Sequence, residues 1–210
     1  NINNNEGYIK VRDLKSKLIN GKDFNLKSNF INDTLFIASK YETISQNINN
    51  LKFYHTIDIA NKSVIGFTDL DLIINNQGWS LEKENISLIP KLIFDREFKD
   101  LKLLNTKFVN NDQSIKFSLA ENVYRSDYSF SFKNVSLDNF ISKKQNILFS
   151  GNINGDLNLN KENKLYKGVS NITINELHAN EEDLGIANLN IEASKDLKSF
   201  NLSFKVIKDS

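Results

Sequence analysis

The side chains that could carry chemistry in this chain are two histidines, a pair of alternating aspartates and one acidic run. His55 and His178 could hold a metal ion if a carboxylate completed the site, but no ligand spacing such as His-Glu-x-x-His surrounds either of them. Asp69 and Asp71 alternate, so on a strand they would share one face about 7 Å apart, as a glycosidase acid and base could. The acidic run 181–183 could bind Ca²⁺.

Each of these features has a plainer interpretation, which we favour. Two unlinked histidines within strand patterns are ordinary residues, alternating aspartates are typical of a solvent-facing strand face, and an acidic run is typical of a turn. Gly151 and Gly155 lie in a strand pattern with no helix after them, so they predict a bulge or a close backbone approach and not a phosphate loop. We therefore predict no catalytic residue, no metal site and no cofactor.

The composition excludes several classes of protein. Lys and Arg number 27 and Asp and Glu 26, so the net charge of +1 gives no electrostatic reason to expect nucleic acid as a partner. The absence of Cys removes thiol redox chemistry and thiolate metal sites. No window has the length of apolar sequence that a spanning helix needs, and no stretch resembles a signal peptide. Met is absent, including at position 1, so we expect an excised piece or a processed form.

Apolar residues at alternate positions recur along the chain, which predicts strands with one buried face. The clearest case is 149–159, where Phe, Gly, Ile and Leu alternate with Ser, Asn and Asp. Further strands are expected at 24–30, 35–41, 53–60, 64–74, 79–81, 86–88, 91–94, 101–104, 115–119, 130–132, 172–174, 189–193 and 200–206. Short breaks rich in Asn, Asp and Gly separate them, so sequence neighbours are expected to pair antiparallel.

Helical signals are scarce. Val11, Leu14, Leu18 and Ile19 give a weak helical pattern over 11–19, and 136–141 could form one capped turn. No linker divides the chain, and no strict period indicates a repeat protein. The residues therefore predict an all-β antiparallel meander, taken as one domain over 1–210.

The C-terminal part resembles the TamB family of periplasmic proteins. The motifs are Tyr128 to Ile141, then the run from Phe149 to Leu159 (FSGNINGDLNL), then Ser170 to Ile174 with Leu177, then Asp183 to Ile191 (DLGIANLNI). In that family an S-G-x-I-N-G-x-L strand, an N-I-T-I-like strand and an L-G-x-x-x-L-x-I strand recur in this order. The resemblance covers 128–207, and residues 1–127 match the family in style only.

The resemblance implies a long sheet curled into an open, apolar groove, reaching across the periplasm from an inner-membrane anchor that lies outside this chain. It implies the movement of phospholipid between the inner and outer membranes, support for outer-membrane protein assembly, and a BamA- or TamA-type outer-membrane barrel as partner. The expected partners of the groove are phospholipid acyl chains. The residues expected to line it are Ile115, Phe117, Leu119, Phe130, Phe132, Phe149, Ile153, Leu157, Leu159, Ile172, Ile174, Leu189, Ile191, Leu202 and Phe204.

Alternation alone is compatible with other proteins. A closed β-sandwich buries the same residues against a second sheet, and it would suit a ligand- or surface-binding module of an adhesin-like protein. An outer-membrane barrel also alternates, but its aromatic girdles are not evident here. An enzyme would need a cleft that gathers Asp69, Asp71 and a histidine. The curvature and layering of the sheet distinguish these alternatives.

Overall fold

The computed structural model describes residues 5–15, 20–43, 48–74, 77–82, 89–140, 147–163, 165–193 and 199–208. The chain divides into two compact units, residues 1–106 (unit 1) and 107–210 (unit 2), and each is described by itself.

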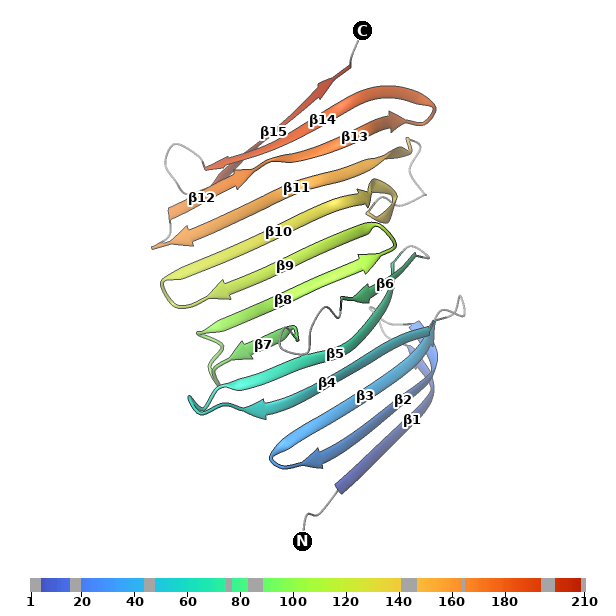
Figure 1. Cartoon of the computed structure of the whole chain (residues 1–210), viewed down its shortest axis with the longest axis vertical. Helices are drawn as coiled ribbons and strands as arrows, with labels where there is room; N and C mark the ends of the chain where they lie inside the picture. The colour runs from blue at the N-terminus through green and yellow to red at the C-terminus, as the bar shows by residue number, and fades with distance from the viewer. Residues whose placement is uncertain are drawn as a thin grey trace. The chain divides into compact units, whose positions relative to one another are not determined.

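The protein is an all-β antiparallel meander, as the alternation predicts (Figure 1). The strand order follows the chain, except that β12 pairs with β11 and β7 pairs with β5 and β8 beside that path. The strands are β1 (Asn5–Lys15), β2 (Asn20–Ile31), β3 (Thr34–Thr43), β4 (Ile48–Ile57), β5 (Ser63–Ile74), β6 (Gln77–Leu81), β7 (Lys91–Phe94), β8 (Leu101–Asn110), β9 (Gln113–Glu121), β10 (Arg125–Ser136), β11 (Phe149–Glu162), β12 (Leu165–Ser170), β13 (Ile172–Ala179), β14 (Glu182–Ala193) and β15 (Phe200–Ile207).

Asn and Asp make many of the turns because they tolerate a left-handed backbone. Asn32 and Asp33 have φ of 46° and 60° between β2 and β3. Asn61 has φ of 59° between β4 and β5, and Asn111 has φ of 53° between β8 and β9. These short turns hold consecutive strands side by side and antiparallel, which confirms the expectation from the polar breaks.

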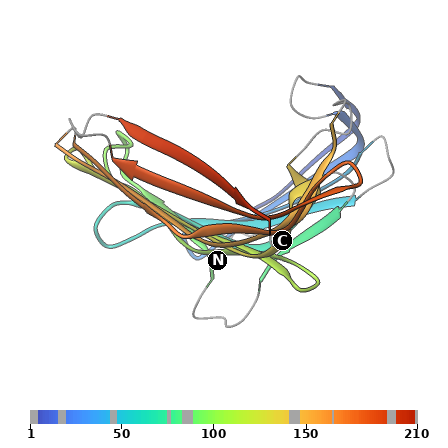
Figure 2. The ribbon, with the colours of Figure 1, turned by 90° about the horizontal axis from the view of Figure 1, so that it is seen from above.

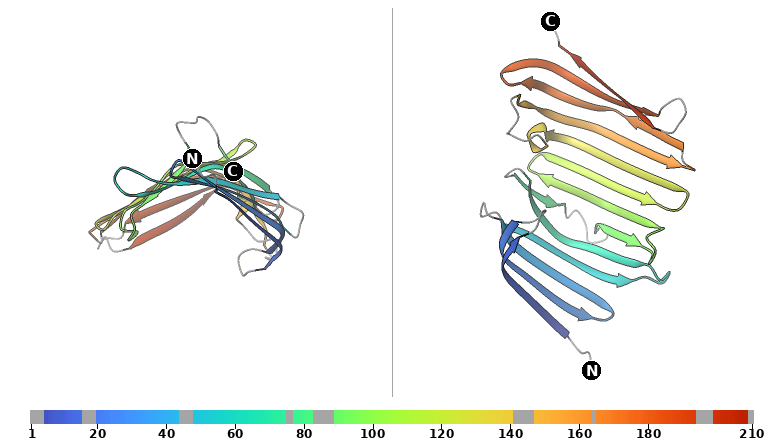
Figure 3. Two further views of the ribbon diagram at one scale, coloured as in Figure 1. Left: turned by 90° about the horizontal axis from the view of Figure 1, so that it is seen from below. Right: turned by 180° about the vertical axis from the view of Figure 1, so that it is seen from behind.

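Several strands contain a β-bulge, in which one extra residue faces the partner strand. The bulge of β2 contains Asp23 (φ 51°), that of β10 contains Asn134 (φ 52°) and that of β13 contains Glu176 (φ 51°). Bulges bend strands and increase their twist. In the end-on views the strands of each unit accordingly bend along their length (Figures 2 and 3).

Few described side chains are fully buried, because the described strands of each unit form a single layer. The buried apolar residues are Val64, Trp79, Leu81, Val135, Ile172, Leu177 and Ala187. A sandwich core of this length would bury many more. Within the described part of each unit, the closed β-sandwich is therefore not observed.

Two local predictions have different outcomes. Residues 11–15, expected to begin a helix, lie in β1 and pair with β2 through Val11 opposite Phe24; residues 16–19 lie outside the described residues. The helix prediction is wrong because pairing to β2 outweighs a weak local spacing. The turn expected at 136–141 is confirmed as a 3₁₀ turn, η2 (Leu137–Asn139), although the Ser136 side chain does not cap it. The strand expected at 86–88 lies outside the described residues.

Candidate functional site: the apolar face of unit 2

The strand registers place the expected lining residues on one face of unit 2, which we call the apolar face. Phe117 lies opposite Phe130, and Phe130 lies opposite Leu157, so the three side chains share a face. Ile153 faces Ile174 across β11 and β13, and Leu189 faces both Ile172 and Phe204.

The remaining expected residues follow from the same registers. Alternation within each strand and the cross-strand pairs place these on the apolar face as well: Ile115, Leu119, Phe132, Phe149, Leu159, Ile191 and Leu202. The structure thus brings the fifteen residues of the sequence prediction together on one face of one unit. That they line a lipid groove stays a prediction.

The aromatic rings of this face pack beside one another. The ring centroids of Phe117 and Phe130 are 4.6 Å apart, and those of Phe130 and Phe132 are 6.5 Å apart. The first pair joins β9 to β10, and cross-strand aromatic pairs of this kind stabilise a sheet, whereas the second pair lies along β10. The face nevertheless remains accessible: Leu202 is 67% exposed and Phe204 57%, whereas a second layer would bury both.

The opposite face of unit 2 is polar. It carries Ser118 opposite Ser129, and Ser129 lies opposite Asn158 in turn. Across the last two strands, Asn188 lies opposite Lys205 and Asn190 opposite Ser203. Unit 2 is therefore an amphipathic sheet, with one wettable side and one apolar side.

Gly155 shows why glycine occurs within β11. Its φ is +115°, and a Cβ built on it would lie 2.3 Å from the backbone oxygen of Asn171, which follows β12. The close approach lets Asn171 donate its backbone N–H to Asp156 O, where the chain passes from β12 to β13. The expectation of a close backbone approach at this glycine is confirmed.

The structure does not bring the residues expected from chemistry into one site. Asp69 and Asp71 do share a face, but Asp69 Oδ2 pairs with Lys52 Nζ at 3.0 Å, and Asp71 accepts hydrogen bonds from Asn50 and Ser80. His55 lies in β4 between Leu35 and Ile65.

His178 and the acidic run lie together at the turn between β13 and β14. His178 faces Asp183, and its Nδ1 is 2.8 Å from the backbone oxygen of Glu176. Among the residues that the structure describes, no three His, Asp or Glu side chains are grouped as a metal site. None of the described helices is long and apolar enough to cross a membrane.

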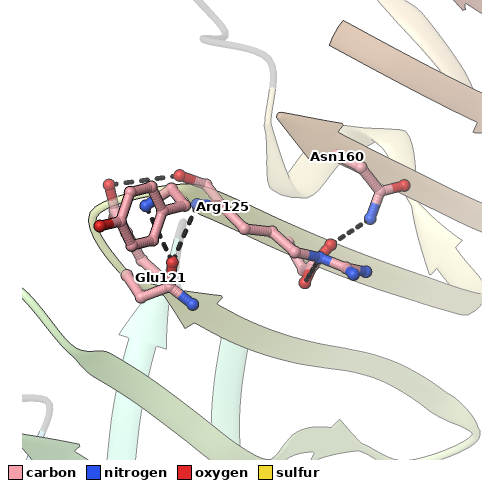
Figure 4. A network of polar contacts seen from close by, with 7 residues as sticks. Glu121, Arg125 and Asn160 are labelled. Atoms are coloured by element: carbon pink, nitrogen blue, oxygen red, sulfur yellow. Dashed lines mark hydrogen bonds and ion pairs between the residues drawn. The ribbon is translucent and has the colours of Figure 1, made fainter. Parts of the chain in front are cut away.

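A polar network closes the strand ends of unit 2 (Figure 4). Arg125 Nε donates to Asp127 Oδ2 at 2.6 Å, and Asn160 donates to the other carboxylate oxygen. The hydrogen bond from Arg125 lowers the pKa of Asp127 against an opposing effect of burial, and the bond from Asn160 lowers it further. In the turn between β9 and β10, Asn122 Oδ1 accepts hydrogen bonds from the backbone N–H groups of Tyr124 and Arg125. These hydrogen bonds join the β9–β10 turn and the start of β10 to β11.

Unit 1 contains a cavity of about 840 Å³ over its more polar face. Its lining includes the side chains of Tyr8, Lys27, Phe36 and Lys52 from four adjacent strands, together with Asn29. The sequence interpretation missed this site, because none of these residues forms a local motif and only strand pairing brings them together. Exposed aromatic residues at polar-face positions are the sequence signal that could have indicated it.

Comparison with protein-family models, with curated proteins and with solved structures gave no match. The fold and the two faces therefore carry the functional argument.

Proposed function

We propose that this chain is a non-enzymatic segment of a TamB-like periplasmic protein and that its apolar face carries phospholipid acyl chains between the inner and outer membranes. In this function the segment supports outer-membrane protein assembly, and other parts of the protein engage a BamA- or TamA-type barrel. The observation that supports the proposal most strongly is the continuous apolar face of unit 2, which no second layer covers among the described strands.

The physical reason is the cost of exposing lipid to water. Each CH₂ group moved from a bilayer into water costs about 0.8 kcal/mol, so two sixteen-carbon chains cost about 25 kcal/mol. An apolar surface such as Phe117, Phe130 and Leu157 in register can replace the bilayer environment along the path. No bond is made or broken, which agrees with a site that contains packed rings and aliphatic side chains.

The test compares neighbouring substitutions on opposite faces of β11. Leu157→Asp places a carboxylate on the apolar face, whereas Asn158→Asp places it on the polar face one residue away. Protein purified without detergent is extracted and its phospholipid is measured by mass spectrometry, and transfer between labelled donor and acceptor vesicles is followed in parallel.

We expect the wild-type chain and Asn158→Asp to retain phospholipid and to transfer it, and Leu157→Asp to lose at least tenfold of both, because an ionised carboxylate is costly in an apolar environment. Circular dichroism confirms that each variant retains its sheet. Lipid-free wild-type protein, or equal transfer by the two folded variants, contradicts the proposal.

A second candidate function is a binding module of a surface protein, built here as a single sheet. The observation that favours it is the unit 1 cavity, which lies over a polar face and is lined by aromatic and charged side chains.

A further inference from the structure

The unit 1 cavity lies over two adjacent rows of cross-strand neighbours. One row consists of Tyr8, Lys27, Ala38 and Lys52, in register across β1 to β4. The adjacent row consists of Glu6, Asn29, Phe36 and Tyr54. Directly opposed residues in antiparallel strands share a face, and so do residues two apart along one strand. Both rows therefore project to the same side of the sheet. The residues between the rows, such as Gly7 and Ser28, supply the backbone floor.

Two aromatic side chains at this cavity are exposed to solvent. Tyr8 is 57% exposed and Phe36 43%. Large aromatic residues on the polar side of a sheet bury no core, so their ring faces are available to a ligand. The hydroxyl of Tyr8 donates to Asn25 Oδ1 at 2.8 Å, which fixes one edge of that ring.

Gly66 and Tyr54 support the second ring. The Tyr54 ring lies so close over Gly66 that a Cβ on this glycine would be 2.2 Å from it. Phe36 packs against Tyr54 with ring centroids 6.3 Å apart. Because Gly66 has no side chain, the Tyr54 ring can lie over its backbone. Tyr54 in turn packs against Phe36 beside the cavity. The ring is held in place before any ligand binds, which lowers the entropy cost of binding.

The polar groups of the cavity complement the rings. Lys27 has no ion pair within the described part of the chain, whereas Lys52 is already paired with Asp69. Asn29 also lines the cavity and is only half-buried, so its amide group adds a neutral polar contact. The site therefore combines one available cation and a neutral amide with exposed ring faces.

We propose that this cavity binds a saccharide that carries an acidic group. A sugar ring presents an apolar C–H face, which Phe36 and Tyr8 match, and hydroxyl groups, which the Asn29 amide and the hydroxyl of Thr68 can engage. The ammonium of Lys27 supplies the partner for a carboxylate. The volume of about 840 Å³ lies within the range of small-ligand sites.

The charge balance argues for a saccharide over a nucleic acid, which also stacks on aromatic residues. Single-stranded nucleic acid needs a groove with several cations that follow its phosphates. Here Glu6 faces the same cavity as Lys27, and Lys52 is neutralised by Asp69. A ligand with one acidic group per few sugar rings fits this balance better than one with a charge at every unit.

The test is native electrophoresis of the full chain through gels that contain dissolved deacylated gellan, neutral dextran or no polymer, with an oligothymidylate titration beside it. Gellan carries one carboxylate for every four sugar rings, which is the charge density that the cavity fits. Phe36→Ala removes a ring face and Lys27→Ala removes the available cation. The matched controls are Tyr124→Ala and Lys116→Ala, which remove an exposed tyrosine and an exposed lysine of unit 2.

We expect gellan to retard the wild-type chain more than dextran does, and each cavity variant to weaken that retardation about tenfold, while both controls stay within twofold. Lys27 is exposed, so its variant remains informative if Phe36→Ala loosens the sheet. Absence of retardation, equal retardation of controls and cavity variants, equal retardation by dextran, or tighter binding of oligothymidylate overturns the proposal. Phospholipid transfer by the apolar face is a separate measurement, so either proposal can fail alone.

Discussion

At the scale of single residues, both backbone conformation and close packing favour glycine at position 155 of β11. Gly155 combines a φ of +115° with a backbone oxygen 2.3 Å from the position of a Cβ. Gly78 in β6 has an ordinary φ, and the nearest atom to its Cβ position is 3.7 Å away. The two glycines therefore form a matched pair for substitution by alanine.

We expect Gly155→Ala to lower the free energy of unfolding by about 1–3 kcal/mol, because the added methyl group meets backbone that cannot move aside and the residue keeps a strained φ. Gly78→Ala is expected to be neutral or to stabilise by up to about 1 kcal/mol through the unfolded state. Urea unfolding followed by circular dichroism gives both values. Equal effects of the two substitutions would show that Gly155 and Asn171 lie further apart in solution.

The Asp127 carboxylate gives a pH-dependent prediction. Its pKa is lowered first by the hydrogen bond from Arg125 and also by that from Asn160, so the ionised form is favoured in the folded state. A lowered folded-state pKa stabilises the fold at pH above the ordinary value near 4, and this stabilisation is lost as the pH falls through the lower, folded-state value.

We expect Arg125→Gln to raise the pKa of Asp127 toward its ordinary value, measured by carbon-13 NMR of the carboxyl group. The acid-induced loss of stability should become correspondingly less steep. Lys161→Gln serves as the control, because Lys161 is a nearby cation of β11 that is not among the groups that lower the pKa of Asp127. An unchanged Asp127 titration in Arg125→Gln would contradict the ion pair shown in Figure 4.

At the scale of elements, the Ser170 hydroxyl joins two strands. It accepts the backbone N–H of Ile191 at 2.8 Å and donates to the backbone oxygen of Leu189 at 2.9 Å, so it bridges β12 and β14 where β12 ends. Both backbone groups lose this partner in Ser170→Ala, and an unsatisfied buried group costs about 1–3 kcal/mol.

We expect Ser170→Ala to destabilise the chain by about that amount and to speed amide hydrogen exchange at Ile191. The control is Ser203→Ala, on the exposed polar side of β15. Fast exchange at Ile191 in the wild-type chain as well would mean that the bridge is not formed in solution.

The elements themselves were largely predictable, since apolar alternation marks the strands and Asn or Asp marks the turns. The expected helix was wrong over 11–15, because Val11 and Leu14 fit a helical spacing as well as a strand, and only pairing with β2 distinguishes the two. The bulges were not predictable either. Asn134 differs in no local way from the Asn residues that alternate normally along β11.

The faces of unit 2 were predictable to the same extent as its strands, because residue parity decides which side a side chain takes. The unit 1 cavity was not, because Lys27 and Lys52 are brought into one row, with Ala38 between them, only by the registers of β2, β3 and β4. Likewise, the Lys52–Asp69 ion pair depends on a bulge in β5 that the sequence does not reveal.

At the scale of the whole molecule, the accessible surface is 14369 Å². A globular monomer of 24.1 kDa is expected to expose roughly 10,000 Å², and its extended chain roughly 35,000 Å². The chain therefore buries only about four-fifths of the surface that a globular protein of its mass buries on folding. The excess exposure is what single-layer sheets produce.

We accordingly expect the total heat-capacity change of unfolding, measured by calorimetry, to be about one-fifth below the value for a globular protein of 210 residues. The heat-capacity change should be measured on protein that has been freed of lipid by organic extraction and refolded, because bound lipid would cover the apolar face. A full globular value would mean that the apolar faces become covered in solution, for example by pairing between molecules.

The bulges also bear on how such a sheet tolerates insertions and deletions. Phe132 and Val135 are an odd number of residues apart, yet both lie on the apolar face, as do Ile174 and Leu177. A bulge thus accommodates one extra residue, and the residues on either side of it keep to the same faces of the sheet as before. Asn134 and Glu176 adopt the left-handed conformation at these two points, so a one-residue insertion that forms a bulge leaves the two faces of the sheet unexchanged.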